Sequence, residues 1–354
     1  MKIGILTQHF LLNYGGIIQN YALQQVLIKL GHEPLTFEHD TCYGHLRWAL
    51  RSVKSILKTR SFKSLPVRPV YKGRIGQKNF IKFILNHIQS APISKFTPSI
   101  TRDYGIEAYV VGSDQIWRPA FNLGERLGNM FLDFTGGGVK KVAYAASFGT
   151  SEWEFSAEQT HTCSVLAQRF NAISVREDSG VTLCKEHFGV DAVHVLDPTM
   201  LLDKEDYLKT SACIPKMKRH LFVYSLVVSD KLMAVAAQIA KSMHLEIVVM
   251  EAGDKVKAED SIEQWFAHFR DAEFVVTDSF HGMVFSLIFN VPFNVVVNKS
   301  GGVSRYTSLL SQFSLQDRIV DEVPFMDMIN WDEVNKKRSE MKTSSIDFLK
   351  NALS

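Results

Sequence analysis

The sequence predicts an α/β protein that contains two doubly wound parallel sheets. Short apolar runs of strand length alternate with segments that carry apolar residues at helical spacing. The first of these runs is followed by a glycine loop, a helical segment and a second run, which is the order of a βαβ unit. The alternation stops near Pro198 and restarts at Leu221, which indicates a second domain of the same class.

The first half of the chain predicts a sheet with five or more strands. KIGILT at 2–7 is a buried strand, and the tetrapeptide at 13–16, NYGG, is a turn. The next segment has apolar residues on one helical face and ends at Gly31, a favourable C-terminal cap. PLTFEHD follows as the second strand. Further strands are expected at 109–112, 141–147, 172–176 and in VHVL, which ends at residue 196, with helices at 157–170 and 178–188.

The second half repeats the pattern after a hinge expected near 198–218. Strands are expected at 221–228, 246–250, 273–278 and 294–297, and helices at 231–244, at 261–270 and from His281 onward. We therefore predict one domain at 1–200 with a basic helical insertion at 41–102, a second at 215–330, and a C-terminal helix at 331–354 that packs back on the body.

The net charge of +3 is unevenly distributed along the chain. Residues 41–102 contain thirteen Lys or Arg and no Asp or Glu, which leaves 27 basic against 37 acidic residues elsewhere. A basic segment on an acidic body indicates an anionic partner, such as a phosphorylated substrate, an acidic lipid surface or nucleic acid. Apolar residues at helical spacing in this segment also fit a helix that lies on a membrane. A solvated helical insertion remains the other interpretation.

The composition favours a cytoplasmic protein. The four cysteines, at 42, 163, 184 and 213, lie far apart and form no CxxC pair, which argues against a zinc site and a disulfide framework. The first ten residues, MKIGILTQHF, become polar too soon for a signal peptide. The longest apolar stretch, 283–297, is shorter than the roughly 20 residues that span a bilayer.

Polar groups at the carboxyl ends of strands are the candidates for a site, because ligands of such sheets bind there. The first candidate group is Asn13, Tyr14, Gly15 and Gly16, where paired glycines allow a ligand close to a helix start, with Gln19 one turn later. The second is Gly112, Ser113, Asp114 and Trp117, in which Asp114 is a candidate base. A tight turn and helix capping explain these two groups equally well.

Two further candidates follow later strands. Arg176 ends the strand at 172–176, where a guanidinium can bind phosphate or carboxylate, although a surface ion pair with Glu177 or a salt bridge elsewhere is the alternative. Asp197, before Pro198, is expected to shape a rigid turn. In TDSFHG, His281 begins a helix beside Ser279 and Gly282, so it can contact a phosphate or act as a general acid. These neighbours cannot form a hydrolase triad among themselves, and GxGxxG, P-loop and GxSxG motifs are missing.

Six motifs in order resemble the polysaccharide pyruvyl transferase family across residues 3–297. They are NYGGIIQNYALQQVLIKLGH, VVGSDQIWRP, AYAASFG, ISVRED, VLDPTMLL and TDSFHGMVFS. The resemblance implies two Rossmann-like domains in a glycosyltransferase B-like arrangement, with the site in the interdomain cleft. It also implies transfer of the enolpyruvyl unit of phosphoenolpyruvate to a sugar of a surface-polysaccharide precursor, without another cofactor.

The resemblance assigns roles to the candidate residues. Arg176 and His281 are expected to hold the phosphate and carboxylate of phosphoenolpyruvate, with Ser279 and Gly282 assisting, while His281 supplies a proton and Asp114 removes one. Some members have an arginine where this chain has Phe280, and we expected the basic insertion, through Lys72 or Arg74, to replace its charge. Some also have a histidine where this chain has Ala146 to Gly149.

Several functions stay open on sequence alone. The leading hypothesis is a pyruvyltransferase whose acceptor is a lipid-linked or nucleotide-linked saccharide, with residues 41–102 at the inner membrane face. The runner-up is a glycosyltransferase of the same fold with a nucleotide-sugar donor. A non-catalytic member of the family is a third reading. A nucleic-acid-binding protein is disfavoured, because the rest of the chain is acidic and shows no nucleic-acid-binding motif.

Overall fold

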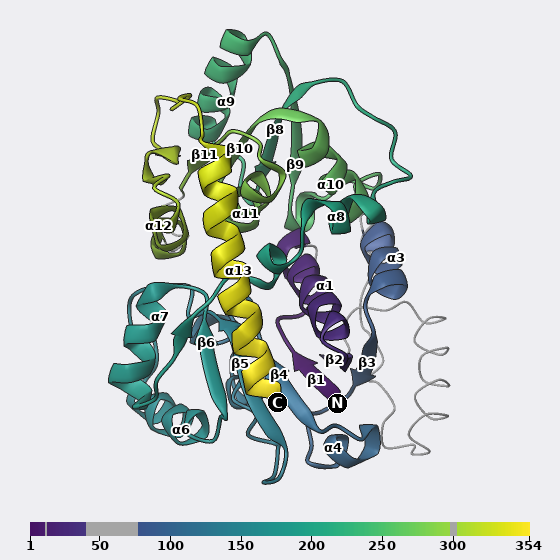
Figure 1. Ribbon diagram of the computed structural model, residues 1–354, viewed down its shortest axis with the longest axis vertical. Helices are drawn as coiled ribbons and strands as arrows, with labels where there is room; N and C mark the ends of the chain where they lie inside the picture. Colours follow the sequence, from purple (N-terminus) through teal and green to yellow (C-terminus); the bar gives the residue numbers. More distant parts are fainter. Residues whose placement is uncertain (11–12, 40–76, 298–302) are drawn as a thin grey trace.

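A computed structural model of the protein describes residues 1–10, 13–39, 77–297 and 303–354. It has two lobes, one above the other, each containing a parallel sheet with helices packed around it (Figure 1). The helix α13 (Trp331–Leu353) runs from the second lobe down the side of the first (Figure 1). The two parallel sheets confirm the predicted fold class.

The first sheet has seven strands in the order β3-β2-β1-β4-β5-β6-β7, all parallel to their neighbours. Its central strands are buried apolar runs, as parallel strands covered on both faces require. The strands are β1 (Lys2–Leu6), β2 (Glu33–His39), β3 (Ser90–Ile93), β4 (Ala108–Val111), β5 (Lys140–Ala146), β6 (Ala172–Val175) and β7 (Val193–His194). The helices are α1 (Tyr14–Lys29), α3 (Gln77–His87), α4 (Ser99–Tyr104), α5 (Glu125–Met130), α6 (Ala157–Ala167) and α7 (Asp178–Leu183).

The second sheet has five parallel strands in the order β12-β11-β10-β8-β9. The strands are β8 (His220–Ser225), β9 (Glu246–Glu251), β10 (Ala272–Thr277), β11 (Phe293–Val296) and β12 (Ile319–Val320). The helices are α8 (Lys204–Thr210), α9 (Asp230–Met243), α10 (Ile262–Asp271), α11 (Phe280–Phe289) and α12 (Val303–Gln312). Short helical turns connect elements of both lobes: η2 (Pro119–Phe121), η3 (Cys184–Phe188), η4 (Pro198–Leu201), η5 (Gly253–Lys255) and η6 (Gln316–Arg318).

The described part of the predicted helical insertion at 41–102 contains helices α3 and α4, but the prediction is wrong at residues 90–93. Residues 90–93 form β3, the edge strand of the first sheet, and pair with β2. The strand has four residues and contains Pro92, so the sequence shows no apolar run there. An edge strand tolerates proline because it has a partner on one side only. The proposed amphipathic helix near 46–57 lies outside the described residues, and so do Lys72 and Arg74.

The predicted turn at 13–16 is also wrong, because α1 already begins at Tyr14. The side chain of Asn13 caps the helix and accepts a hydrogen bond from the N–H of Gly15 at 3.1 Å. Both glycines therefore lie in the first helical turn, where the backbone N–H groups have no partner within the helix.

Aromatic side chains fill the junction between the lobes along α1. The Tyr14 ring lies 5.6 Å from Trp265 of α10 and 5.5 Å from Tyr224 of β8. All three side chains are fully buried, in one hydrophobic cluster that includes residues of both sheets. The helix α1 is buried on nearly all sides, which explains why its apolar residues are not confined to one face.

Helix α13 joins the lobes on another side. The hydroxyl of Ser345 accepts a hydrogen bond from the N–H of Leu196, just after β7, at 3.0 Å. Lys342 forms an ion pair with Asp203 at 2.8 Å, and Leu349 is fully buried. The C-terminal helix thus fixes the segment that connects the two sheets.

The Tyr14 hydroxyl gives a test of this junction. It is buried without a hydrogen-bond partner among the described residues, so Tyr14→Phe is expected to keep or slightly raise stability. Tyr14→Ala leaves a cavity and is expected to lower the free energy of unfolding by about 3–5 kcal/mol. Urea unfolding of the two variants measures this difference. A large loss in Tyr14→Phe would mean that the hydroxyl has a partner.

Candidate active site

The carboxyl ends of the strands in the two sheets face each other across the junction. From the first lobe, Asp114 follows β4, Arg176 follows β6 and Asp197 follows β7. From the second lobe, His281 follows β10 in the first turn of α11. Salt-bridge distances connect all four side chains, so the structure brings together groups far apart in the sequence.

The carboxylate of Asp197 is the centre of this cluster. Its Oδ2 lies 2.8 Å from a terminal nitrogen of Arg176, 3.0 Å from the hydroxyl of Ser113 and 3.8 Å from Nε2 of His281. Its Oδ1 accepts hydrogen bonds from the backbone and hydroxyl of Thr199. Burial alone would raise the pKa of Asp197, but the positive charges of His281 and Arg176 outweigh burial and hold this pKa well below its ordinary value.

Arg176 is buried between three carboxylates. Burial tends to lower its pKa, but Asp197, Asp114 and Glu177 outweigh that effect and leave the pKa raised. Asp114 Oδ1 lies 3.5 Å from the guanidinium, and the Asp114 side chain is 13% exposed, whereas that of Asp197 is 1% exposed. Asp114 is thus the more accessible carboxylate. Its backbone φ of 70° is unusual for a residue other than glycine and is typical of functional sites.

His281 packs directly against the first turn of α1. A Cβ atom on Gly15 would lie 1.9 Å from Nδ1 of His281, so only glycine permits this contact. The Nε2 atom is buried and has no hydrogen-bond partner within the described residues, and the same is true of Nε of Arg176. Buried polar atoms are normally hydrogen-bonded to protein, water or a ligand, so these two nitrogens are available to bind a ligand.

The strand-to-helix turn that carries His281 is held by its own side chains. Ser279 caps α11 and accepts a hydrogen bond from the N–H of Gly282 at 3.4 Å. Asp278 accepts hydrogen bonds from the N–H groups of Leu226 and Val227, after β8. The hydrogen bond of Ser279 thus stabilises the first turn of α11, and those of Asp278 connect this turn to the loop after β8.

A second arginine reaches the cluster from α12. The Phe280 ring lies 4.4 Å from the guanidinium carbon of Arg176 and 5.9 Å from that of Arg305. Burial and the nearby charge of Arg176 lower the pKa of Arg305 from its ordinary value. The Ser308 hydroxyl of α12 accepts a hydrogen bond from the N–H of Asp178 at the start of α7, which fixes α12 against the first lobe. Sequence reasoning missed Arg305, because no motif marks it.

The loop after β5 contains a carboxylate network in place of a histidine. Glu177 Oε1 accepts hydrogen bonds from the hydroxyl of Ser147 and from the N–H groups of Phe148 and Gly149. Glu177 is fully buried, and its Oε2 has no partner within the described residues. The alternative of a surface pair between Arg176 and Glu177 is not observed, since both side chains are buried, and Arg176 instead forms salt bridges with Asp197 and Asp114.

Other candidate residues lie at the edge of the cluster or away from it. Ser113 donates its N–H to Gln19 Oε1 at 2.9 Å, so these two side chains position the Asp114 loop. A Cβ on Gly112 would lie 2.0 Å from the Tyr144 carbonyl oxygen, which explains this glycine by packing.

The structure does not bring Trp117 to the cluster, because its indole donates to the Met130 carbonyl inside the hydrophobic core. Tyr14 faces the aromatic junction.

The parts of the chain that the structure describes show no group of three metal-ligating side chains. None of the described helices has the length and hydropathy of a membrane span.

The sequence model of polysaccharide pyruvyl transferase matches residues 13–300 of the chain. The chain belongs to this family. The family assignment supports a transferase that modifies polysaccharides. A search of curated proteins finds no match.

Solved structures confirm that this pyruvyl transferase family member has the glycosyltransferase B fold. UDP-GlcNAc 2-epimerase from Neisseria meningitidis, bound to UDP-GlcNAc, is 10% identical, with a TM-score of 0.51, and the match covers 100% of this chain and 99% of that one. A UDP-N-acetylglucosamine 2-epimerase structure from Listeria monocytogenes is 11% identical, with a TM-score of 0.50, and the match covers 99% of this chain and 91% of that one. A glycosyltransferase from Rickettsia africae is 10% identical, with a TM-score of 0.43, and covers 100% and 94%.

The paired glycines of α1 give a matched test of the site geometry. Gly15→Ala forces the His281 ring or α1 to move, and is expected to lower the free energy of unfolding by about 1–3 kcal/mol. The atom nearest to a Cβ on Gly16 would be Asp114 Oδ2, at 3.8 Å, so Gly16→Ala is expected to be neutral or stabilising by about 0.5–1 kcal/mol. Thermal unfolding compares the variants, and equal effects at both positions would contradict the contact.

Proposed function

We propose that the protein transfers the pyruvyl group of phosphoenolpyruvate, as a ketal, to a sugar of a surface-polysaccharide precursor. The observation that carries this proposal is the cluster of Arg176, Arg305 and His281, buried at the junction of the lobes, in which Nε of Arg176 and Nε2 of His281 have no hydrogen-bond partner among the described residues. Asp114 and Asp197 offset part of the positive charge, and the remaining N–H donors suit the oxygens of a small anion such as phosphoenolpyruvate, which has a phosphate and a carboxylate.

The positive charges suit both binding and catalysis. Arginine binds phosphate and carboxylate through planar pairs of N–H donors. Because Arg176 and Arg305 lie against the same phenylalanine ring, a bound dianion would relieve their mutual repulsion. Their charges would then stabilise the phosphate as it leaves, which is the usual role of fixed cations in transferring such groups.

Two proton movements complete the proposed reaction. His281 gives a proton to the methylene carbon of phosphoenolpyruvate, and Asp114 accepts the proton of the attacking sugar hydroxyl. The C2 carbon then carries the new C–O bond, and a second hydroxyl of the same sugar displaces phosphate and closes the ketal. One hydroxyl proton is balanced by the new methyl C–H, and the other leaves with inorganic phosphate.

The acceptor in this proposal is a lipid-linked or nucleotide-linked saccharide. The family name supports a saccharide, and the basic segment at 41–102, most of it outside the described residues, suits the anionic carrier or a membrane surface. This segment is also the basis for placing the protein in the cytoplasm at the inner membrane face.

A transferase with a nucleotide-sugar donor is the second candidate. The observation in its favour is the fold, which resembles an epimerase crystallised with UDP-GlcNAc. The buried arginine–histidine cluster favours the smaller phosphoenolpyruvate, because its charged side chains lie close together and are almost entirely buried.

Product analysis tests the proposed reaction. The protein is incubated with phosphoenolpyruvate and a panel of saccharide acceptors, and both released phosphate and the mass of the pyruvylated sugar are measured. His281→Asn and Asp114→Asn are each expected to lower the rate by about 100-fold or more, because each loses a proton-transfer group.

Asp347→Asn is the control for this assay, since Asp347 pairs with Lys350 in an exposed ion pair on α13. It should keep the wild-type rate. Phosphate release that is unchanged in both site variants would contradict the assigned roles. A product formed only with nucleotide-sugars would support the second candidate.

A further inference from the structure

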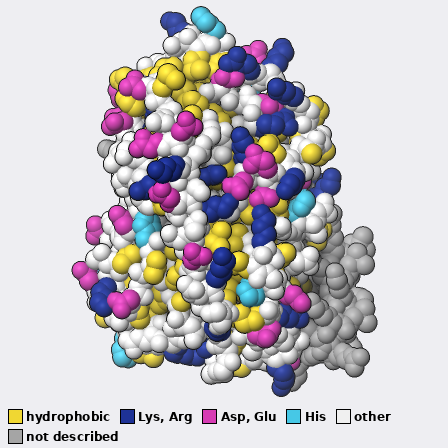
Figure 2. Space-filling model, in the orientation of Figure 1, with side chains coloured by type: hydrophobic (Ala, Val, Ile, Leu, Met, Phe, Trp, Pro, Cys, Tyr) yellow, Lys and Arg dark blue, Asp and Glu magenta, His cyan; other side chains and the backbone are white. Residues whose placement is uncertain are grey.

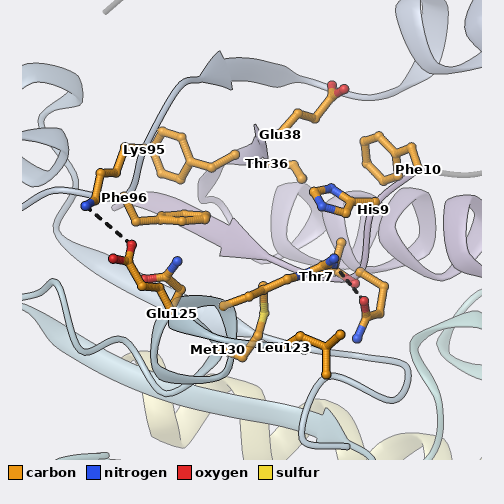
Figure 3. A pocket seen from close by; sticks show the side chains of 14 residues that line it. Thr7, His9, Phe10, Thr36, Glu38, Lys95, Phe96, Leu123, Glu125 and Met130 are labelled. Atoms are coloured by element: carbon orange, nitrogen blue, oxygen red, sulfur yellow. Dashed lines mark hydrogen bonds and ion pairs between the residues drawn. The ribbon is translucent and has the colours of Figure 1, made fainter. Parts of the chain in front are cut away.

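The first lobe contains a cavity of about 250 Å³ beside the carboxyl ends of β1, β2 and β3. Figure 3 shows the rings of Phe10, His9 and Phe96 around this space, with the Lys95–Glu125 ion pair on one side. In the sheet order, β4 and β5 separate β1 from β6, so the loop after β4, which carries Asp114, lies between this cavity and Arg176. No residue that lines the cavity belongs to the donor cluster.

The lining suits a sugar ring. Phe10 and Phe96 provide aromatic faces, which pack against the C–H groups of sugars, while Asn129 provides an amide for hydroxyl groups. A cavity with apolar walls and a few polar groups is the usual form of a small-molecule site.

Arg126 adds an unusual charge to this cavity. One terminal nitrogen donates to Gln8 Oε1 at 2.8 Å, and its Nε is buried without a partner among the described residues. Burial lowers the pKa of Arg126, and no carboxylate counteracts this effect. The adjacent Glu125 instead pairs with Lys95 at 3.3 Å. A half-buried guanidinium with a free N–H, and without a carboxylate partner, is suited to an anionic ligand group.

The cavity is connected to the proposed base by one loop. Gln8 donates to the carbonyl oxygen of Gln115 at 2.9 Å, and the Thr7 hydroxyl donates to that of Ser113 at 3.3 Å. The two accepting carbonyl groups belong to the residues directly before and after Asp114 in the sequence. A sugar in the cavity would therefore lie next to the loop that carries the base, as an acceptor must.

We propose that this cavity binds the acceptor saccharide and that Arg126 selects an acceptor with an anionic substituent, a carboxylate or a phosphate. This inference rests on the proposed function and adds a substrate class to it. The charge would come from a uronic acid or from a sugar phosphate, two sources with the same recognition chemistry.

Binding of simple sugars tests this proposal without any transfer reaction. Glucose, glucuronate and glucose 6-phosphate are titrated into the wild-type protein and observed by ligand NMR. At least one anionic sugar is expected to bind about tenfold more tightly than glucose, since a charged hydrogen bond is formed. The anion that binds more tightly identifies the carboxylate or the phosphate as the preferred group.

Two substitutions at Arg126 are compared with one control. Arg126→Gln is expected to reduce the preference to about twofold or less, and Arg126→Lys to retain part of it, because the charge remains. Arg102→Gln, on α4, removes an exposed arginine that pairs with Asp103 and does not line the cavity, so it should keep the wild-type preference. Equal binding of all three sugars to wild type, or a preference that survives Arg126→Gln, would overturn the proposal.

Phosphoenolpyruvate binding is measured in the same four proteins to separate the two claims. Unchanged phosphoenolpyruvate binding in Arg126→Gln shows that the variant is folded and that the donor cluster is intact. If no protein binds phosphoenolpyruvate while the Arg126-dependent sugar preference is present, the donor assignment is wrong and the anionic-sugar site stands.

Discussion

The buried carboxylate of Asp197 has neighbours from both lobes of the molecule. Arg176 and Ser113 approach it from the first sheet, and His281 approaches it from the second. A buried charge is tolerated only when it is paired and hydrogen-bonded, and removing one partner of such a pair typically costs about 3–5 kcal/mol. The position of Arg176, the orientation of His281 and the Asp114 loop therefore all depend on this one carboxylate.

Contacts elsewhere in the structure hold the two lobes in the relative position that brings this cluster together. Aromatic rings around Tyr14 fill the junction along α1, and α13 fixes the segment after β7 from the other side. Helix α12 contacts the start of α7, which brings Arg305 towards Arg176. Burial and the charge of Arg176 disfavour the charged form of Arg305, so an anionic ligand bound beside the two guanidiniums would stabilise that form.

Sequence reasoning located most strands of the two sheets and selected three of the four clustered side chains, but it assigned Asp197 only to a turn. Asp114 and Arg176 meet because parallel strands of one sheet place their carboxyl ends at a common edge, whereas His281 comes from the second sheet and reaches them because the two sheets face each other. β3 was missed because a four-residue edge strand with a proline has no apolar signal. Arg305 was missed because an arginine in an ordinary helix appears exposed until the tertiary contacts of α12 bury it. Trp117 was a site candidate because it follows a strand end, but its ring stacks on Phe131 in the hydrophobic core.

The most direct test of the account is whether Arg176 and Arg305 share one small anion. Phosphoenolpyruvate is titrated by calorimetry into the wild-type protein, Arg305→Gln and the exposed control Arg219→Gln, with folding checked by circular dichroism. Saturable binding that is about 30-fold or more weaker in Arg305→Gln, and unchanged in the control, is predicted. Absence of binding to wild type, or equal affinity in Arg305→Gln, would contradict the account, and binding of UDP-GlcNAc instead would indicate a nucleotide-sugar donor.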